Sequence, residues 1–351
     1  MDPLLVHVKE NDGSDLHLVA GQPPRFRSKG AIRVIEGQGV LSNDRLSAMM
    51  QEIASPRGWE EYATTGDLDF AFSLEGVARY RANYFVQQSG VACVFRIIPE
   101  EIISLENLNL PQSICDLADL KEGLVLVTGP TGSGKSTTLA AIIDKINKTY
   151  SRHVVTIEDP VEFVHQNRNS LFSHREVGLH TQGFGPALRS AIRQDADVIL
   201  VGEMREQETI SLAITAAEMG MLVFGTLHTN NAAKTIDRII DAFPPEEQNM
   251  IRLSLSESLT AVVSQLLLPR AEDKGRIAAN EILLKTSGLP NDIRDGNTPM
   301  LASIIQSGKT QGMQAMDDVL FQYVKDKKVT AQDAYMKATD KARFLPLLKA
   351  E

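Results

Sequence analysis

The chain has 351 residues, of which 43% are hydrophobic and 23% charged, which favours a globular protein with more than one domain. No apolar run approaches the roughly 18 residues that span a bilayer, and residues 1–10 lack the pattern of a secretory signal, so we expect a cytoplasmic protein. The net charge of −9 argues against a nucleic-acid-binding surface over the whole molecule. Cys93 and Cys115 do not form a C-x-x-C pair, which disfavours a disulfide framework or a cysteine zinc site.

The first hundred residues alternate short apolar runs with turn-forming residues, which predicts a meander of short strands. These strands are expected at residues 16–19, 31–35, 68–74 and within 77–98. One helix is expected to interrupt them over residues 41–59, where Ser42 or Asn43 can cap the first turn. Residues 99–111 are rich in acidic residues, Asn and Pro, and predict a linker between two lobes.

From Gly123 onward, continuous apolar runs alternate with helical periodicity. This pattern is typical of a mostly parallel sheet that helices cover on both faces. The predicted strands are residues 124–127, 154–157, 198–201 and 221–227. After Leu268 and Pro269 only helical periodicity remains, which predicts a small helical subdomain at the C-terminal end.

Residues 129–136 fit the pattern G-x-x-x-x-G-K-[S/T] and stand between a predicted buried strand and a predicted amphipathic helix. Glycines let successive backbone N–H groups converge on phosphate groups, and the helix N-terminus adds the positive end of its dipole. Lys135 is expected to reach the β- and γ-phosphates, and the Ser136 hydroxyl to bind Mg²⁺. We therefore predict a nucleotide-binding site at Gly129, Pro130, Thr131, Gly132, Ser133, Gly134, Lys135, Ser136 and Thr137.

Hydrolysis also requires a carboxylate that orients the attacking water. Glu203 ends an apolar strand, which suits this role, although a solvated charge at the strand end is the alternative. Gly202 stands where many P-loop enzymes carry a magnesium-binding Asp, so Glu158 and Glu162, after another strand, become candidates for the metal. His228 also ends a strand, and the sequence leaves open whether it contacts the γ-phosphate or is structural. The other six histidines show no metal-ligand spacing.

Together these motifs resemble the secretion and pilus motor ATPases, and among them the PilT/PilU family of type IV pilus retraction ATPases. Residues 13–24, 157–162, 197–205 and 225–230 are similar to the family's N-terminal signature, Asp box, Walker B motif and His box, in the family's order. The family's Walker B motif also carries Gly before Glu. The resemblance implies an α/β protein with four parts: a PAS-like N-terminal α+β domain (1–99), a linker (100–120), a RecA-like P-loop domain (121–270) and a C-terminal helical subdomain (271–351).

The resemblance further implies roles for individual residues. Glu203 would be the catalytic carboxylate, Glu158 and Glu162 the acids near Mg²⁺, and His228 the His-box residue. Arg81 and Arg96 lie in strands comparable to those whose arginines approach the phosphates, with a surface salt bridge as the alternative for each. The family also implies a homohexamer that uses ATP and Mg²⁺ to power pilus retraction and twitching motility, acting on the inner-membrane pilus platform protein at the cytoplasmic base of the pilus.

Residues 300–309 depart from the family pattern, because they lack two arginines that retraction ATPases carry there. An accessory or divergent paralogue therefore remains an alternative. Pilus-assembly and type II secretion ATPases usually add a four-cysteine zinc module, and type IV secretion ATPases fit the N-terminal signature less well. A RecA-like DNA translocase is disfavoured by the acidic charge, and a transporter subunit by the lack of an L-S-G-G-Q motif. The sequence does not decide between retraction and assembly.

Overall fold

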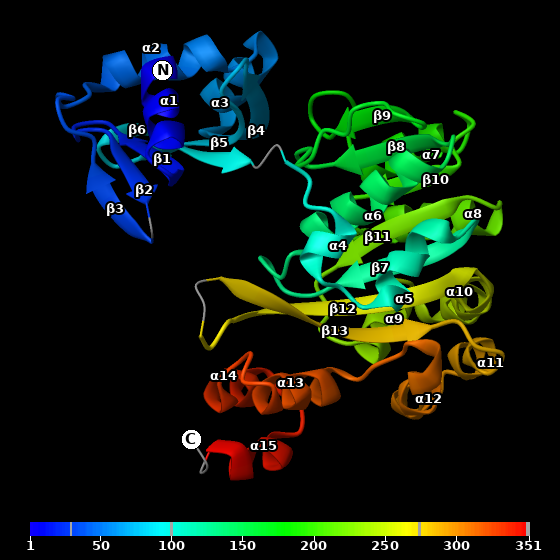
Figure 1. The fold of residues 1–351 in the computed structure, drawn as a ribbon. Coiled ribbons are helices and arrows are strands. Elements are labelled where there is room, and N and C mark those ends of the chain that lie inside the picture. Colours follow the sequence, from blue (N-terminus) through cyan, green and yellow to red (C-terminus); the bar gives the residue numbers. More distant parts are fainter. Residues whose placement is uncertain (29, 99–100, 273–274, 349–351) are drawn as a thin grey trace. The chain divides into compact units, whose positions relative to one another are not determined.

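The computed structural model describes residues 1–28, 30–98, 101–272 and 275–348, which divide into two compact units (Figure 1). The first unit comprises Met1–Glu101 and Asp159–Val164, and the second comprises Ile102–Glu158 and His165–Glu351. The chain therefore passes between the units more than once. Pro99 and Glu100, at the predicted boundary between N-terminal domain and linker, lie outside the described residues.

The first unit contains a six-stranded antiparallel sheet in the order β3-β2-β1-β6-β5-β4. Its strands are β1 (Gly13–Val19), β2 (Arg25–Ser28), β3 (Ala31–Val34), β4 (Asp67–Leu74), β5 (Ala78–Gln87) and β6 (Gly90–Ile98). Its helices are α1 (Asp2–Glu10), α2 (Asn43–Ile53) and α3 (Pro56–Thr65). The helices and the sheet enclose one apolar core, in which Leu5, Tyr80, Tyr84 and Phe95 are fully buried.

The predicted N-terminal strands are confirmed, but the predicted single helix over residues 41–59 is wrong. The segment forms two helices, because Ala54 is extended and Ser55 starts a new helix with Pro56 at its first position. Ser42 caps α2, accepting from the Arg45 backbone N–H, and Ser55 caps α3 in the same way. The helix α1 was not predicted.

The second unit is built on a seven-stranded sheet in the order β13-β12-β7-β11-β10-β8-β9. All neighbours in this sheet run parallel except β12 and β13. The strands are β7 (Gly123–Thr128), β8 (His153–Glu158), β9 (Leu171–Glu176), β10 (Val198–Val201), β11 (Leu222–Leu227), β12 (Leu259–Pro269) and β13 (Arg276–Leu284).

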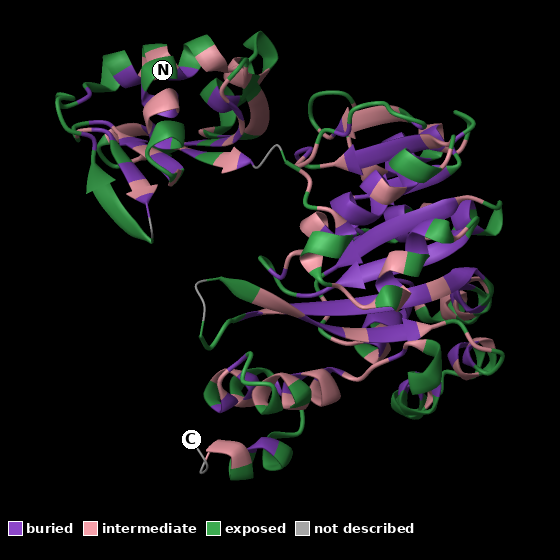
Figure 2. Cartoon of the chain, in the orientation of Figure 1, coloured by how far each residue is buried: buried purple, intermediate pink, exposed green. Residues whose placement is uncertain are grey.

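Helices cover both faces of this sheet, and Figure 2 shows its central strands as buried throughout. Leu124 and Leu126 of β7 enter one apolar core, and Val125 and Val127 enter the other, as the twofold repeat of a strand requires. The helices and short 3₁₀ turns are α4 (Leu105–Leu108), α5 (Gln112–Cys115), η1 (Asp116–Asp119), α6 (Lys135–Thr149), α7 (Phe184–Ala191), α8 (Gln207–Glu218), α9 (Ala232–Ile240), α10 (Pro245–Ser258), α11 (Leu289–Arg294), η2 (Thr298–Met300), α12 (Leu301–Ser307), η3 (Gly308–Gln311), α13 (Met316–Lys325), α14 (Ala331–Lys337) and α15 (Lys341–Leu348).

Two expectations about this unit need correction. The region after Pro269 is not helical only, because β13 pairs with β12 along its whole length. The segment predicted as a linker carries α4, α5 and η1, and its residues Ile114, Leu117 and Ala118 are buried in a core of the second unit. Its polar and Pro-rich composition had concealed these apolar positions. The strands β9 and β12 were also not predicted.

Candidate functional site

The predicted nucleotide-site residues of the second unit lie where four neighbouring parallel strands end. In the sheet, β7 pairs with β11, β11 with β10, and β10 with β8. The P-loop (residues 129–136) follows β7, His228 follows β11, Glu203 follows β10, and Glu158 ends β8. Carboxyl ends of parallel strands meet at one edge of a sheet, which is the usual place for a ligand in such folds.

The P-loop has the backbone that a phosphate-binding turn requires. Gly129, Gly132 and Gly134 have φ angles of 142°, 76° and 87°, which other residues rarely adopt. Lys135 is the first residue of α6, and its ammonium group donates to the backbone carbonyls of Gly129 (2.8 Å) and Pro130 (3.2 Å). The lysine therefore lies across the loop, beside the positive end of the helix dipole.

Glu203 is held by two cationic or potentially cationic side chains. Its carboxylate oxygen Oε1 accepts a hydrogen bond from Nε of Arg205 and lies 3.0 Å from Nε2 of His228. The Glu203 side chain is about one-fifth exposed, so water can reach the carboxylate. The structure thus brings Glu203 and His228 together, and it adds Arg205, which sequence reasoning quoted only as part of the Walker B motif.

The glycine that precedes Glu203 has a packing reason. A β-carbon at Gly202 would lie 3.1 Å from the Ile157 carbonyl oxygen and 3.2 Å from the Glu158 Cα atom. A side chain at this position would therefore require the end of β8 to shift by a few tenths of an ångström. The departure from the common Walker B pattern is thus matched by the close approach of β8.

The loop after His228 is fixed at several points. The hydroxyl groups of Thr229 and Thr235 are 2.7 Å apart, and Asn231 caps α9 by accepting from the Lys234 N–H. The partly buried carboxylate of Glu281 on β13 accepts from the Ala232 N–H at 2.9 Å, and burial raises the pKa of Glu281. Glu281 had not been singled out, although it is a charged residue within a mostly apolar strand.

The remaining predicted site residues belong to the first unit. Arg81 donates to Asp69, and this hydrogen bond raises the pKa of Arg81, with Glu162 and Asp159 adding to the effect. Arg96 donates to Asp15 at 2.8 Å. Burial alone would raise the pKa of Asp15, but the hydrogen bonds from Arg96 and Ser14 outweigh it and lower the value. Salt bridges, the alternative considered for each arginine, are thus present.

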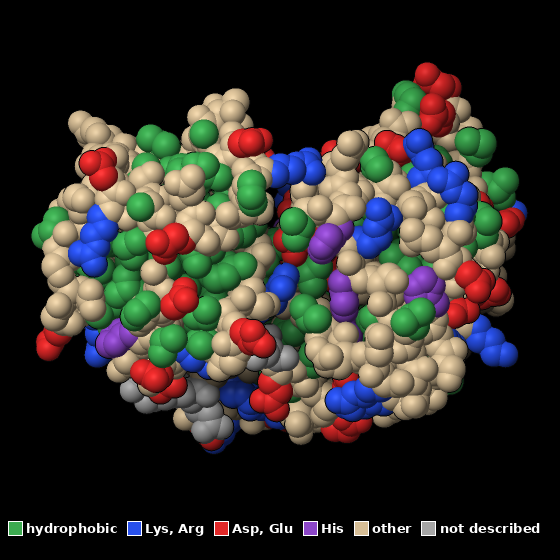
Figure 3. Space-filling view, turned by 90° about the horizontal axis from the view of Figure 1, so that it is seen from above, with side chains coloured by type: hydrophobic (Ala, Val, Ile, Leu, Met, Phe, Trp, Pro, Cys, Tyr) green, Lys and Arg blue, Asp and Glu red, His purple; other side chains and the backbone are tan. Residues whose placement is uncertain are grey.

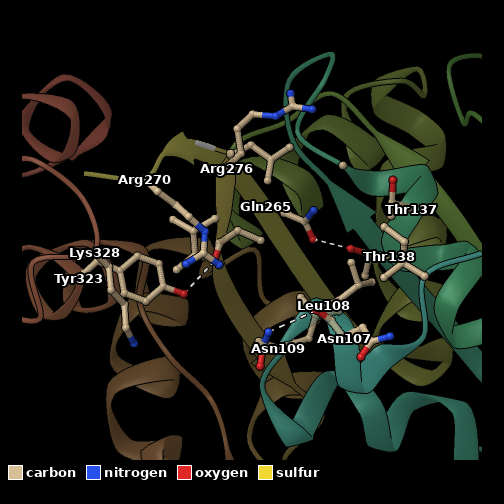
Figure 4. A pocket seen from close by; sticks show the side chains of 17 residues that line it. Asn107, Leu108, Asn109, Thr137, Thr138, Gln265, Arg270, Arg276, Tyr323 and Lys328 are labelled. Carbon is tan, nitrogen blue, oxygen red and sulfur yellow. Dashed lines mark hydrogen bonds between the residues drawn. The ribbon is translucent and has the colours of Figure 1, made fainter. Parts of the chain in front are cut away.

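A pocket of about 720 Å³ adjoins the helical end of the P-loop in the second unit (Figure 4). Thr137 and Thr138 of α6 line it on one side, and Asn107 and Leu108 of α4 lie nearby. On the other side are Gln265 on β12 and the basic or aromatic side chains of Arg270, Arg276, Tyr323 and Lys328. A pocket of this size with polar groups on its wall can hold a small organic molecule.

The P-loop has the backbone geometry of a loop that binds the phosphates of a nucleotide. The loop glycines adopt the left-handed conformations that let consecutive N–H groups point to one side. The Ser133 hydroxyl is buried and has no hydrogen-bond partner within the described residues, and Ser136 stands on the first turn of α6. A polar group left unsatisfied in a glycine-rich turn is consistent with a ligand-binding loop.

The fold and this loop define the class of P-loop nucleotide-binding proteins with a parallel α/β sheet. Over residues 1–340, the chain matches the model of the family described as type II/IV secretion system protein. The chain belongs to this family. Within the described residues, none of the helices has the length and apolar character that crossing a membrane requires.

Individual relatives support the same assignment. The chain is 47% identical over 335 residues to the type IV pilus retraction ATPase PilT of Pseudomonas aeruginosa, covering 95% of this chain and 97% of the relative. It is 38% identical over 347 residues to the type IV pilus ATPase PilU of the same organism, covering 99% and 90%. A crystal structure of the pilus retraction motor PilT with bound ADP superposes with a TM-score of 0.90 at 41% identity, covering 97% and 98%.

Proposed function

We propose that this protein is an ATPase that powers the retraction of type IV pili, and with it twitching motility. The observation that carries the proposal is that a chain 47% identical to a pilus retraction ATPase over nearly its whole length keeps a complete P-loop. The loop stands before α6, and Glu203 and His228 follow neighbouring strands. ATP is the substrate, and hydrolysis supplies the free energy for mechanical work.

The P-loop performs the binding step. Backbone N–H groups of residues 129–137 and the Lys135 ammonium group bind the phosphates, and Lys135 exchanges its carbonyl partners for phosphate oxygens. The Ser136 hydroxyl, with Glu158 and Glu162, would hold Mg²⁺, which would supply positive charge beside the phosphates. The pocket beside Thr137 accepts the base and ribose.

Glu203 performs the hydrolytic step by accepting a hydrogen bond from the attacking water and directing its oxygen at the γ-phosphate. His228, whose Nε2 lies 3.0 Å from the Glu203 carboxylate, orients that carboxylate and contacts the γ-phosphate when ATP is bound. Arg81 and Arg96 stabilise the charge that develops on the phosphate in the transition state. Release of either arginine from its present aspartate partner accompanies this role.

The working assembly in this proposal is a homohexamer that acts on the inner-membrane pilus platform protein, at the cytoplasmic side of the membrane. Domain-level motion between residues 1–99 and 121–270 transmits the force, with residues 271–351 completing each subunit. Light scattering in ADP, ATP and a non-hydrolysable analogue tests the assembly. A monomer in every nucleotide state would contradict the ring.

An accessory retraction motor is the second candidate. The 38% identity to PilU spans 99% of this chain, and residues 300–309, which include α12, lack the two arginines expected in a retraction ATPase. The two candidates differ in autonomy. An accessory motor hydrolyses ATP but retracts pili only when a second retraction ATPase is present.

The distribution of charged side chains on the surface disfavours a DNA translocase. On the face shown in Figure 3, Lys and Arg side chains are scattered among Asp and Glu side chains, and the residues shown in colour form no continuous basic band. Strong single-stranded DNA binding normally requires a basic groove with stacking aromatic side chains. ATPase activity that single-stranded DNA stimulates in a salt-sensitive way would revive this alternative.

The decisive experiment pairs an ATPase assay of the purified protein with a deletion strain. We expect magnesium-dependent ATP hydrolysis, and loss of twitching with an excess of surface pili in the deletion strain. Cells without pili would instead indicate an assembly motor. Complementation in a strain that lacks other retraction ATPases then separates the autonomous from the accessory motor.

A further inference from the structure

Strand β12 carries two adjacent polar residues, Ser264 and Gln265, in a run that is otherwise apolar. The strand lies parallel to β7, so these residues stand beside the start of the P-loop. Gln265 is only 2% exposed. Buried polar side chains cost free energy unless hydrogen-bonded, which makes the partners of Gln265 informative.

The Gln265 amide connects the last turn of the P-loop to helix α6. Its Nε2 group donates to the Ser133 carbonyl at 2.7 Å, and its Oε1 atom accepts from the Thr138 hydroxyl at 2.9 Å. Ser133 and Thr138 are each 2% exposed. Figure 4 shows the bond to Thr138 at the wall of the pocket. The Gln265 side chain therefore fixes the P-loop relative to helix α6.

The same residue also closes the space beside two glycines of the loop. A β-carbon at Gly129 would lie 2.2 Å from the Gln265 carbonyl oxygen, and one at Gly134 would lie 2.8 Å from its Nε2 atom. The first clash involves backbone, which cannot move aside easily. Gly129 is thus required for its contact with β12 as well as for its φ angle, and Gly134 leaves room for the Gln265 amide.

The hydrogen bond from Gln265 fixes the orientation of the Ser133–Gly134 peptide group. The Ser133 carbonyl and the Gly134 N–H belong to the same planar trans peptide and point in opposite directions. Because the Gln265 amide holds the carbonyl, the Gly134 N–H must point away from that amide. A glycine-rich loop without this restraint would sample other orientations of that peptide.

We propose that Gln265 is a positioning residue for phosphate binding, which fixes the Ser133–Gly134 peptide so that the Gly134 N–H is presented to the phosphates. The proposal rests on the proposed ATPase function and adds a residue outside the P-loop to its site. It differs from a direct contact between Gln265 and the base or ribose in the adjoining pocket, and from a role in stability alone.

The test compares two ligands in the full-length protein. In the proposed binding mode, ADP contacts both the P-loop and the pocket, whereas inorganic pyrophosphate contacts only the P-loop. In Gln265→Met, which keeps the volume but loses both hydrogen bonds, we expect the Kd values for ADP and for pyrophosphate to rise together by about tenfold. Direct contact with base or ribose would instead weaken ADP alone, and would overturn the proposal.

The controls separate this effect from folding and from the proposed function. Gln314→Met removes a similar bond, from Nε2 to the Asn280 carbonyl at 2.8 Å, and should change neither Kd more than about twofold. Gln265→Asn, which keeps an amide but shortens its reach, gives the same comparison if the Met variant does not fold. Unchanged Kd values with a lowered Tm would reduce Gln265 to a structural role, while failure of the wild-type protein to bind ADP would reject the ATPase itself.

Discussion

The two sheets of this protein use charged side chains in different ways. In the parallel sheet, Lys135, Glu203 and Glu158 stand at or just beyond strand ends, where the backbone leaves the sheet and helix N-termini add positive potential. In the antiparallel sheet, Arg81 and Arg96 lie within strands and pair with Asp69 and Asp15. Charged side chains at strand ends are thus available to bind a ligand, whereas those within strands also stabilise their own domain.

The largest effect is expected at the P-loop lysine. Lys135→Ala removes the ammonium group that binds the phosphates, and we expect kcat/KM for ATP to fall by about 10³ or more. Lys148→Ala on the same helix removes only an ion pair with Asp144 and should leave activity within about threefold. A coupled assay of phosphate release measures both. Near-normal turnover in Lys135→Ala would place the phosphate site elsewhere.

The next effect separates binding from chemistry at the end of β10. Glu203→Gln keeps the shape of the side chain but weakens its ability to accept a proton, so kcat should fall by about 10² to 10⁴ while ADP affinity stays within about threefold. Single-turnover kinetics and a nucleotide-binding titration report the two quantities. Glu206→Gln, an exposed substitution nearby, is the matched control. Retained turnover in Glu203→Gln would move the catalytic role to Glu158 or Glu162.

A smaller effect is expected at Arg81, and it tests whether a charged residue within the antiparallel sheet also takes part in catalysis. If Arg81 stabilises phosphate charge, Arg81→Ala lowers kcat by about 10², in addition to the small loss of stability from its pair with Asp69. If it serves only the pair with Asp69, the variant keeps its kcat and loses at most about 1 kcal/mol of stability. Arg25→Ala, at an exposed position of β2 in the same sheet, controls for loss of positive charge. Parallel kcat and Tm measurements decide between the outcomes.

The smallest effect concerns the C-terminal helices. Hydrogen bonds from Lys309, Arg343 and Gln306, partly opposed by burial, lower the pKa of Asp318 to about 2. A carboxylate whose pKa is lowered by folding stabilises the native state above its unfolded pKa of about 3.9, and this contribution is lost as the pH falls towards 2. Asp318→Asn should therefore cost about 1 kcal/mol at pH 7, after solvent screening. Hydrogen exchange in α13 measures this difference, which should shrink below about pH 4; a difference independent of pH would contradict the charge effect.

Sequence reasoning succeeded where a local pattern has one physical interpretation. The P-loop glycines with Lys135, and the apolar runs of β7, β8, β10 and β11, carry their structure in their own periodicity. It failed where the deciding contact is distant in the chain. The buried segment around Ile114 was concealed by polar neighbours, and β13 was missed because short apolar runs do not separate strand from helix.

The same limit applies to the site. Glu203 and His228 could be proposed from strand ends, but their 3.0 Å contact depends on the order of β10 and β11 in the sheet. Gln265 and Glu281 act on loops more than a hundred and about fifty residues away, respectively. The available signal was a polar residue inside an apolar strand. Such a residue indicates a buried partner without identifying it.

The grouping of Asp159–Val164 with residues 1–101 has a consequence for dissecting the molecule. The Arg79 guanidinium donates to the Val161 carbonyl. The N-terminal unit therefore contacts a loop that follows β8 of the second unit's sheet. A fragment that ends after residue 101 would lack that loop. If the first hundred residues were exchanged between relatives, each N-terminal unit would pack against residues 159–164 of the other protein. Chimeras should therefore exchange both segments together.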